Sequence, residues 1–341
     1  MNTPDYNAIS DRLQKSLYDC FWDQPNVRYM AYFPKSETDR YMYWWLAHAL
    51  DVLVDGYERT GDKSYLEQAD ILIKGIIAGN GGTLLNNWYD DMEWLALSML
   101  RLWDITKDES LKKRIDFLWT DIKTAWNDNC GGGMAWRKNQ LDYKNTPANA
   151  PAAILALRLY QHFENPDDLE WGKRIFHWNR DNLMDHETFY VYDGMNREGD
   201  MKIDLDWDFS YCQGTMIGAA VELYRIEGNA ADLALAENIA KATMTRVAAP
   251  NRGIMPYEGK DDCGLFRGIF FRYLSELSET SEDDQFATFI KQNANAIAEQ
   301  GISALGLVGG KWFIAPKSGE TVDLAQHLSG IMVLEMAAKA N

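Results

Sequence analysis

The sequence is short of cysteines and of basic residues. Its 341 residues include 4 Cys and no CxxC pair, and 34 Lys and Arg stand against 51 Asp and Glu, a formal net charge of -17. Widely scattered cysteines exclude a zinc ribbon and a disulfide scaffold, so we expect buried or idle thiols. The acidic balance argues against binding to nucleic acid or to an anionic membrane surface, but it does not disfavour a neutral ligand such as a sugar.

Long hydrophobic runs are also missing. No stretch of about 18 apolar residues occurs, so we expect no membrane span. The first twenty residues show no basic segment followed by an apolar run, and therefore no signal peptide. We expect a cytoplasmic protein, or a secreted or surface protein if an export signal has been removed from the sequence.

Several motifs that carry well-known chemistry are absent. The sequence contains no G-x-x-x-x-G-K-[ST], G-x-G-x-x-G, H-E-x-x-H or G-x-S-x-G pattern, and its 5 histidines show no ligand spacing. The sequence therefore does not favour a nucleotide-binding protein, a zinc protein or a serine hydrolase. We expect neither a metal nor a cofactor.

What the sequence does contain is a recurring pair of helices. Hydrophobic residues make up 46% of it and aromatic residues 13%, a globular composition. An apolar helix end, a short polar turn and a new amphipathic helix recur five times, at 57–72, 102–118, 159–175, 223–239 and 274–290. Since the second helix of each pair has one polar face, we expect it on the outside.

The helices before these turns are apolar nearly all round, and we expect them to be buried on all sides. They are Tyr41–Tyr57, Asp91–Ile105, Pro147–Tyr160, Phe209–Ile226, Gly264–Leu277 and Leu324–Ala340. With an opening outer helix at about 5–20, the pattern predicts six helical hairpins closed into an all-α (α/α)6 toroid, one domain over 1–341. Five loops rich in Gly and aromatics precede the inner helices, so we expect the site at that end. Short β fragments could form at 190–192 and 311–314, without a real sheet.

The sharpest chemical feature is a pair of adjacent carboxylates. Asp90 and Asp91 follow Trp88 and Tyr89 at the start of a buried helix. Glycoside hydrolysis needs one ionised and one protonated carboxyl, and neighbouring residues can reach the short separation that retaining enzymes use. Aromatic rings supply flat faces for sugars. The alternative is structural: Asp90 with Glu93 resembles a capping box, and Asp91 would favour the helix dipole.

Other polar and aromatic residues are expected at the same end, each with a structural alternative. Trp136 follows three glycines, Asn145 could bind a ligand or cap a helix, and Gln213 could read a hydroxyl or be a satisfied core amide. The remaining candidates for substrate binding are Asn149, Asp206, Asp208 and Arg267. Arg267 and Arg272 could instead form structural pairs with carboxylates.

These segments together resemble glycoside hydrolase family 76, the endo-α-1,6-mannanase family. The resemblance covers most of the chain and rests on Trp88–Asp91 with Trp94, Gly131–Trp136, Lys144–Thr146 with Asn149, Tyr211–Gly214 with Gly218, and Phe266–Leu274. It implies an (α/α)6 barrel that acts with retention of anomeric configuration. It also implies that Asp90 is the nucleophile and Asp91 the acid/base, acting on an α-mannan-like oligosaccharide or polysaccharide.

Other readings stay open. Fungal relatives are thought to be cell-wall transglycosidases, so transfer is an alternative to hydrolysis. Another toroid sugar enzyme, such as a GlcNAc 2-epimerase-like isomerase or an unsaturated-uronide hydrolase, is weakened because only His48 and His327 lie on predicted inner helices. A non-catalytic glycan-binding protein would have no need of two adjacent carboxylates. We expect a monomer.

Overall fold

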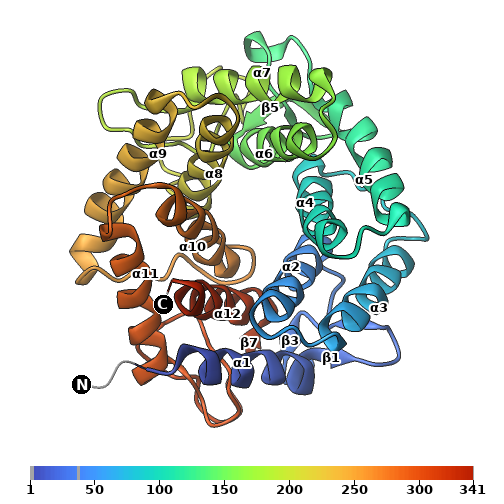
Figure 1. The fold of residues 1–341 in the computed structure, drawn as a ribbon, viewed down its shortest axis with the longest axis vertical. Coiled ribbons are helices and arrows are strands. Elements are labelled where there is room, and N and C mark those ends of the chain that lie inside the picture. The colour runs from blue at the N-terminus through green and yellow to red at the C-terminus, as the bar shows by residue number, and fades with distance from the viewer. Residues whose placement is uncertain (1–3, 37–38, 341) are drawn as a thin grey trace.

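Twelve α-helices in two concentric rings dominate the part of the chain that the structure describes, residues 4–36 and 39–340 of a computed structural model (Figure 1). The inner ring consists of α2 (Tyr43–Thr60), α4 (Tyr89–Thr106), α6 (Thr146–Phe163), α8 (Ser210–Glu227), α10 (Cys263–Thr280) and α12 (Leu324–Lys339). The outer ring consists of α1 (Tyr6–Phe21), α3 (Ser64–Gly79), α5 (Glu109–Ile122), α7 (Pro166–Leu183), α9 (Ala230–Thr243) and α11 (Gln285–Ala296). Short 3₁₀ and π turns occupy Lys123–Ala125, Asn129–Gly131, Met244–Ala248, Ala249–Asn251 and Ile297–Gly301.

The inner ring is closed. Each inner helix packs on the next one along the chain, and α12 packs on both α10 and α2. In the outer ring, the first helix α1 meets the last helix α11, where the Tyr6 hydroxyl donates to Asn295 Oδ1 at 2.6 Å. The predicted (α/α)6 toroid of six hairpins is therefore confirmed. The expected domain, 1–341, includes residues 1–3, 37–38 and 341, which lie outside the described residues.

Local sequence explains where the helices begin and how closely they pack. Asp108 and Asn229 each cap an outer helix by accepting a backbone N–H two residues on, at 2.8 and 3.1 Å. Glycine allows the inner helices to approach: a Cβ on Gly214 would lie 2.5 Å from the Phe270 Cα, and one on Gly268 would lie 2.8 Å from the Ser329 Cα. Both contacts would force neighbouring backbones apart.

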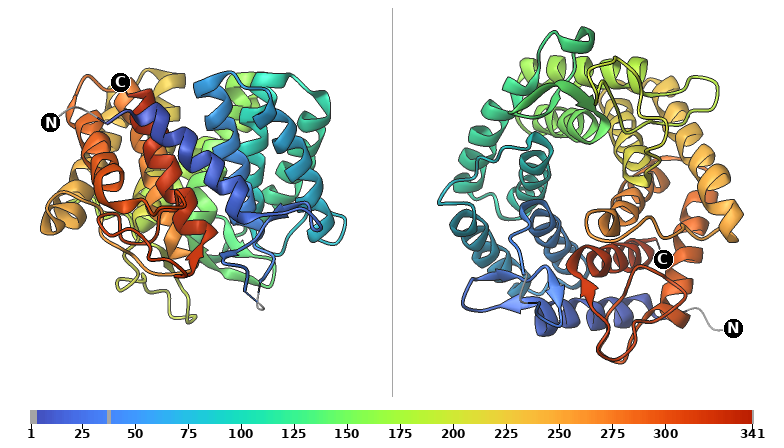
Figure 2. Two further views of the ribbon diagram at one scale, coloured as in Figure 1. Left: turned by 90° about the horizontal axis from the view of Figure 1, so that it is seen from below. Right: turned by 180° about the vertical axis from the view of Figure 1, so that it is seen from behind.

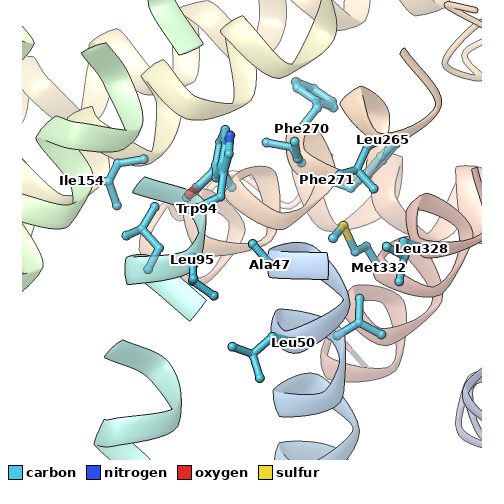
Figure 3. Close-up of a cluster of buried hydrophobic side chains, with 14 of the residues drawn as sticks. Ala47, Leu50, Trp94, Leu95, Ile154, Leu265, Phe270, Phe271, Leu328 and Met332 are labelled. Atoms are coloured by element: carbon cyan, nitrogen blue, oxygen red, sulfur yellow. The ribbon is translucent and has the colours of Figure 1, made fainter. Parts of the chain in front are cut away.

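The core lies between the rings and around the ring centre. Figure 3 shows buried apolar side chains from α2, α4, α6, α10 and α12 gathered there, including Leu50, Leu95, Ile154 and Met332. These inner helices bury residues on every side, as their sequences predict. All four cysteines are free, and Cys20 and Cys212 are buried.

Three small antiparallel sheets lie in the loops. They pair β1 (Trp22–Asp23) with β2 (Arg28–Tyr29), β3 (Tyr32–Phe33) with β7 (Val322–Asp323), and β4 (Ala135–Arg137) with β5 (Gln140–Asn145) and β6 (Gly194–Met195). The expectation of no real sheet is wrong for this third, three-stranded sheet. Its longest strand, β5, is held by pairing on both sides rather than by hydrophobic alternation. Of the two expected β fragments, 190–192 carries only an isolated bridge at Val191, and no strand forms at 311–314.

The two ends of the ring differ. The loops that precede the inner helices project from one side, seen at the bottom of the left view in Figure 2. The opposite end holds the second halves of the inner helices, where Arg101, Arg158 and Arg272 pair with buried carboxylates. Within the described residues, no helix combines the length and apolarity that crossing a bilayer requires.

Candidate active site

A cavity of about 650 Å³ opens at the loop-bearing end of the ring. One side, here called the helix wall, comes from the starts of inner helices and the segments before them: Tyr41, Trp44, Asn86, Trp88, Asp90, Asp91, Trp94, Tyr211, Asp262 and Phe266. The other side, here called the sheet wall, comes from β4–β5–β6 and the loop after it: Trp136, Arg137, Tyr143, Asn145, Asp193, Arg197 and Trp207. The volume is typical of a small-molecule site.

Asp90 and Asp91 lie in the first turn of α4, and both line the cavity. Asp90 Oδ1 accepts from the Asp91 backbone N–H at 3.0 Å, and Asp90 Oδ2 accepts from Trp136 Nε1 at 3.0 Å. Asp91 Oδ2 accepts from Asn86 Nδ2 at 2.7 Å. The charge of Asp262 raises the pKa of both carboxyls, and that of Asp193 also raises the pKa of Asp90. Asp90 therefore accepts two hydrogen bonds that stabilise its negative charge, and Asp91 accepts one.

The pKa values follow this inequality. Burial raises the pKa of Asp90 to about 7, against the hydrogen bonds from Asp91 and Trp136, which favour its ionised form. Burial and then the charge of Asp90 raise the pKa of Asp91 well above its ordinary value. Among the described residues, the Asp91 carboxyl accepts a hydrogen bond from Asn86 alone. The hydrogen bonds therefore favour the ionised form at Asp90 and the protonated form at Asp91.

The capping-box alternative for this pair is wrong. The N-cap of α4 is Trp88, and its side chain makes no capping hydrogen bond. Glu93 is fully buried and neither carboxyl oxygen has a hydrogen-bond partner, so it does not reach back to cap the helix. Asp90 still accepts one first-turn N–H, so part of the dipole interaction is present.

The sheet wall presents one unsatisfied amide. Asn145 is 4% exposed, lines the cavity and, although it is the N-cap of α6, makes no capping hydrogen bond. Its Oδ1 atom is buried without a partner. A buried amide oxygen without a partner costs free energy, unless a ligand hydroxyl satisfies it.

Next to Asn145, the sheet wall is a satisfied network. Asp193 accepts from the hydroxyls of Tyr143 and Tyr211, each at 2.9 Å, and pairs with Arg197 Nη2 at 3.0 Å. Arg197 also lies 3.8 Å from the Trp207 ring centre. This network fixes the edge of the cavity around the exposed face of Trp207.

The helix wall is mostly aromatic. The rings of Tyr211 and Phe266 stack with centres 3.8 Å apart, and Trp44 lies against Phe266 at 6.3 Å. Asp262 accepts from Trp44 Nε1 at 3.0 Å and therefore holds that indole at the cavity. Together with Trp88, which is 38% exposed, these rings offer flat faces to a ligand.

Several predicted site residues do not line this cavity. Tyr89 is buried, with its hydroxyl 3.1 Å from Thr124 Oγ1, because its side chain turns toward the outer ring. Asp206 and Asp208 are exposed, and Asp208 pairs with Arg246 at 3.4 Å. Trp207, which lies between them in the sequence, lines the cavity instead.

Three further predictions of substrate binding are wrong because the three side chains do not line the cavity and bind backbone groups of other segments. Asn149 accepts from Met134 N at 2.7 Å and donates to Met134 O at 3.1 Å. Gln213 Oε1 accepts from Val191 N at 3.0 Å, and Gln213 Nε2 donates to Val191 O at 2.5 Å. Arg267 donates to Gly310 O at 2.7 Å. The structural alternatives were correct for Gln213 and for Arg272, which pairs with Asp55 at 2.6 Å.

Sequence reasoning missed most of the helix and sheet walls. Asn86, Tyr143, Asp193 and Asp262 line the cavity, and each lies in or beside a loop that the sequence analysis placed at this end. The available signal was position: Asp262 directly precedes the inner helix α10, and Asp90 likewise lies at the start of an inner helix, in the first turn of α4. Pairing of β5 with β6, which carries Asp193 inward, has no such signal.

Histidine and metal chemistry receive no support from the described residues. The His48 ring packs at a tilt against Trp94, with ring centres 4.8 Å apart, and His327 contacts Ser16 at 3.0 Å; neither histidine lines the cavity. Across 4–36 and 39–340, no group of three or more His, Cys, Asp or Glu is placed to hold a metal ion. The absence of a metal and of a cofactor stays a prediction.

Comparisons with known proteins agree on one family. The model of glycosyl hydrolase family 76 matches residues 7–341. The GH76A alpha-1,6-mannanase from Salegentibacter sp. HEL1_6 is 37% identical, with a TM-score of 0.94 and coverage of 99% of this chain and 100% of that one. The Lin0763 protein from Listeria innocua is 34% identical, with a TM-score of 0.93 and coverage of 98% and 97%.

Two further relatives bear on the chemistry. A variant of the Salegentibacter enzyme is described as inactive, with two consecutive aspartates changed to asparagine, in complex with alpha-1,6-mannotriose. A curated mannan endo-1,6-alpha-mannosidase of Candida glabrata is 27% identical over 51% of this chain. The chain spans only 42% of the length of that relative.

Proposed function

Because the chain belongs to glycosyl hydrolase family 76 and is a glycosidase, we propose that it cleaves α-1,6-mannosidic linkages by double displacement, with Asp90 as nucleophile and Asp91 as acid/base. The observation that carries this proposal is the unequal pair of carboxyls in the cavity. One receives two hydrogen bonds that favour its ionised form, and its neighbour receives one.

The first step uses this inequality. Ionised Asp90 attacks the anomeric carbon while protonated Asp91 gives its proton to the departing glycosidic oxygen. The bond from the anomeric carbon to that oxygen breaks as the bond to Asp90 forms. When Asp90 becomes an ester it loses its charge, which lowers the pKa of Asp91 because the repulsion between the two carboxylates ends.

The second step runs in the opposite direction. Asp91, now ionised, takes a proton from a water molecule, which attacks the anomeric carbon and releases Asp90. Two inversions at one carbon give net retention. The aromatic faces of Trp88 and Trp44 would support the sugar rings, and the free amide of Asn145 would bind a hydroxyl.

The experiment compares Asp90→Asn with Asp206→Asn on α-1,6-manno-oligosaccharides and yeast mannan, read by product chromatography. We expect Asp90→Asn to lose about 10³-fold or more of kcat, since the nucleophile is gone. Asp206→Asn, an exposed carboxylate outside the cavity, should keep wild-type rates. Proton NMR of the first product should show the α anomer.

A near wild-type rate for Asp90→Asn would contradict the nucleophile assignment, and a β product would contradict double displacement. Full activity on another α-linked glycan, with none on mannan, would contradict the substrate assignment while leaving the two carboxyl roles intact.

A further inference from the structure

Arg137 is the cavity-lining cation that the described carboxylates leave unpaired. Two arginines line the cavity, and Arg197 is held by Asp193 and Asp204 at 3.0 and 2.9 Å. Arg137, by contrast, forms no ion pair with any carboxylate in residues 4–36 and 39–340, although the whole sequence has 51 acidic residues. An arginine left unpaired in so acidic a chain is available to a ligand.

The side chain of Arg137 is nevertheless fixed in place. Its Nε donates to Gln140 Oε1 at 3.1 Å across the β4–β5 turn, and its guanidinium carbon lies 4.6 Å from the Trp136 ring centre. The strand is anchored in turn, since Arg137 bridges to Trp88 and the Lys138 N–H donates to Asn87 O at 2.9 Å. The two terminal nitrogens make no hydrogen bond within the described chain, so the guanidinium of this cavity-lining arginine keeps a fork of two free donors.

The indole of Trp136 sets the position of the Arg137 guanidinium relative to Asp90 and Asp91. Trp136 Nε1 bonds Asp90, and the same ring lies against the guanidinium of Arg137. A sugar ring held at Asp90 and Asp91 is therefore separated from Arg137 by the indole, and the sugar that meets Arg137 is a neighbouring unit.

We propose that Nη1 and Nη2 of Arg137 bind a pair of vicinal hydroxyls on the sugar unit next to the one that is cleaved. Two parallel donors at the end of a planar guanidinium match two adjacent oxygens. Four carboxylates line the same cavity, namely Asp90, Asp91, Asp193 and Asp262, so a neutral diol suits the site better than an anionic group does. The proposal deepens the proposed function and rests on it.

The test measures binding of α-1,6-manno-oligosaccharides of one to four units by calorimetry, in an Asp90→Asn, Asp91→Asn background that cannot consume them. We expect affinity to rise about tenfold at the length that first reaches Arg137, which corresponds to two modest hydrogen bonds. Arg137→Gln should abolish that step and leave shorter ligands within twofold. Arg137→Lys should also lose it, because an ammonium keeps the charge but not the fork.

Two matched variants separate this role from a structural one. Gln140→Leu frees the guanidinium from its tether and should reduce the same step in part. Arg174→Gln removes an arginine of the outer helix α7 whose guanidinium carbon lies 3.9 Å from the Trp126 ring centre. This variant should leave the affinity for every ligand length unchanged. Equal melting temperatures would show that each variant is folded.

The outcomes distinguish the two proposals. An equal loss of affinity at every length, no loss with Arg137→Gln, or full affinity with Arg137→Lys would each overturn the diol contact alone. If the background protein with Arg137 intact binds no manno-oligosaccharide, the substrate assignment fails, and this inference fails with it.

Discussion

The two ends of the inner ring treat the same residue type in opposite ways. At the loop-bearing end, Asp90 and Asp91 face a cavity with indole, amide and backbone donors but no guanidinium partner. At the far end, Asp51 and Asp55 lie between Arg101 and Arg272, with Arg272 Nε 2.6 Å from Asp51. Both pairs lie on inner helices, so the surroundings rather than the secondary structure set their chemistry.

The charge states show what this difference means. Burial raises the pKa of Asp90 to about 7. Burial would raise the pKa of Asp51 as well, but the charges of Arg101 and Arg272 lower it to about 2. A carboxyl whose pKa rises on folding costs stability at neutral pH, and one whose pKa falls contributes stability. The ion pairs at the far end thus stabilise the ring. The carboxyls at the cavity end cost stability, and their raised pKa values are of the kind found at reactive sites.

The largest expected effect sharpens the far-end half of this comparison. Asp51→Asn should lower the free energy of unfolding by about 3–5 kcal/mol at pH 7, because it leaves the buried Arg272 and the partly buried Arg101 incompletely compensated. The wild-type contribution of Asp51 is fully present above pH ~4 and is lost as pH falls through about 2. Urea denaturation at pH 7 measures the loss. Asp116→Asn, which breaks an exposed pair with Lys112, should change stability by less than ~0.5 kcal/mol.

The opposite sign is expected at the cavity. Asp90→Asn should raise the free energy of unfolding by about 1–3 kcal/mol at pH 8, since the folded protein no longer holds a carboxylate that burial disfavours. The gain should fade as pH falls from about 7 toward ~4, where the wild-type carboxyl is protonated in both states. Thermal unfolding at pH 4.5 and pH 8 provides the check. A loss of stability at both values would break the comparison.

The smallest effect concerns one hydrogen bond to Asp90. Trp136→Phe removes the Nε1 donor, so the pKa of Asp90 should rise further, and the rising limb of the kcat/KM profile should move to higher pH by roughly 0.5–1 unit. A pH series from 4 to 9 measures the shift. Trp171→Phe, on the outer ring, should leave the profile in place. An unchanged limb with Trp136→Phe would mean that the indole does not stabilise the ionised form of Asp90.

Much of the fold could be predicted because helical periodicity and all-round apolarity are local signals. The inner helix predicted at Phe209–Ile226 was found at Ser210–Glu227, and it is buried as its sequence predicts. The three-stranded sheet could not be predicted in the same way. Two of its strands have only two or three residues, the longest strand β5 is mainly polar, and β6 joins β5 from about 50 residues along the chain.

The candidate site was predicted in its centre and missed at its edges. Adjacency placed Asp90 and Asp91 together, and the helix start turned both toward the cavity. Asn149 and Gln213 were chosen as buried amides that needed partners, and the partners are backbone groups of neighbouring loops. A sequence shows that a buried amide must be satisfied, but which atom satisfies it depends on the path of a distant loop.

The hydrogen bonds between Asn149 and Met134 also affect how the sequence of the β4–β5 hairpin can change. The amide pairs with both Met134 N and O, much as an adjacent strand would, and so ties the start of β4 directly to α6. Trp136, two residues on, is therefore positioned by α6 as well as by the hairpin tip at 138–139, where the Lys138 N–H donates to Asn87 O at 2.9 Å. Changes at the tip that keep this hydrogen bond should leave the indole beside Asp90.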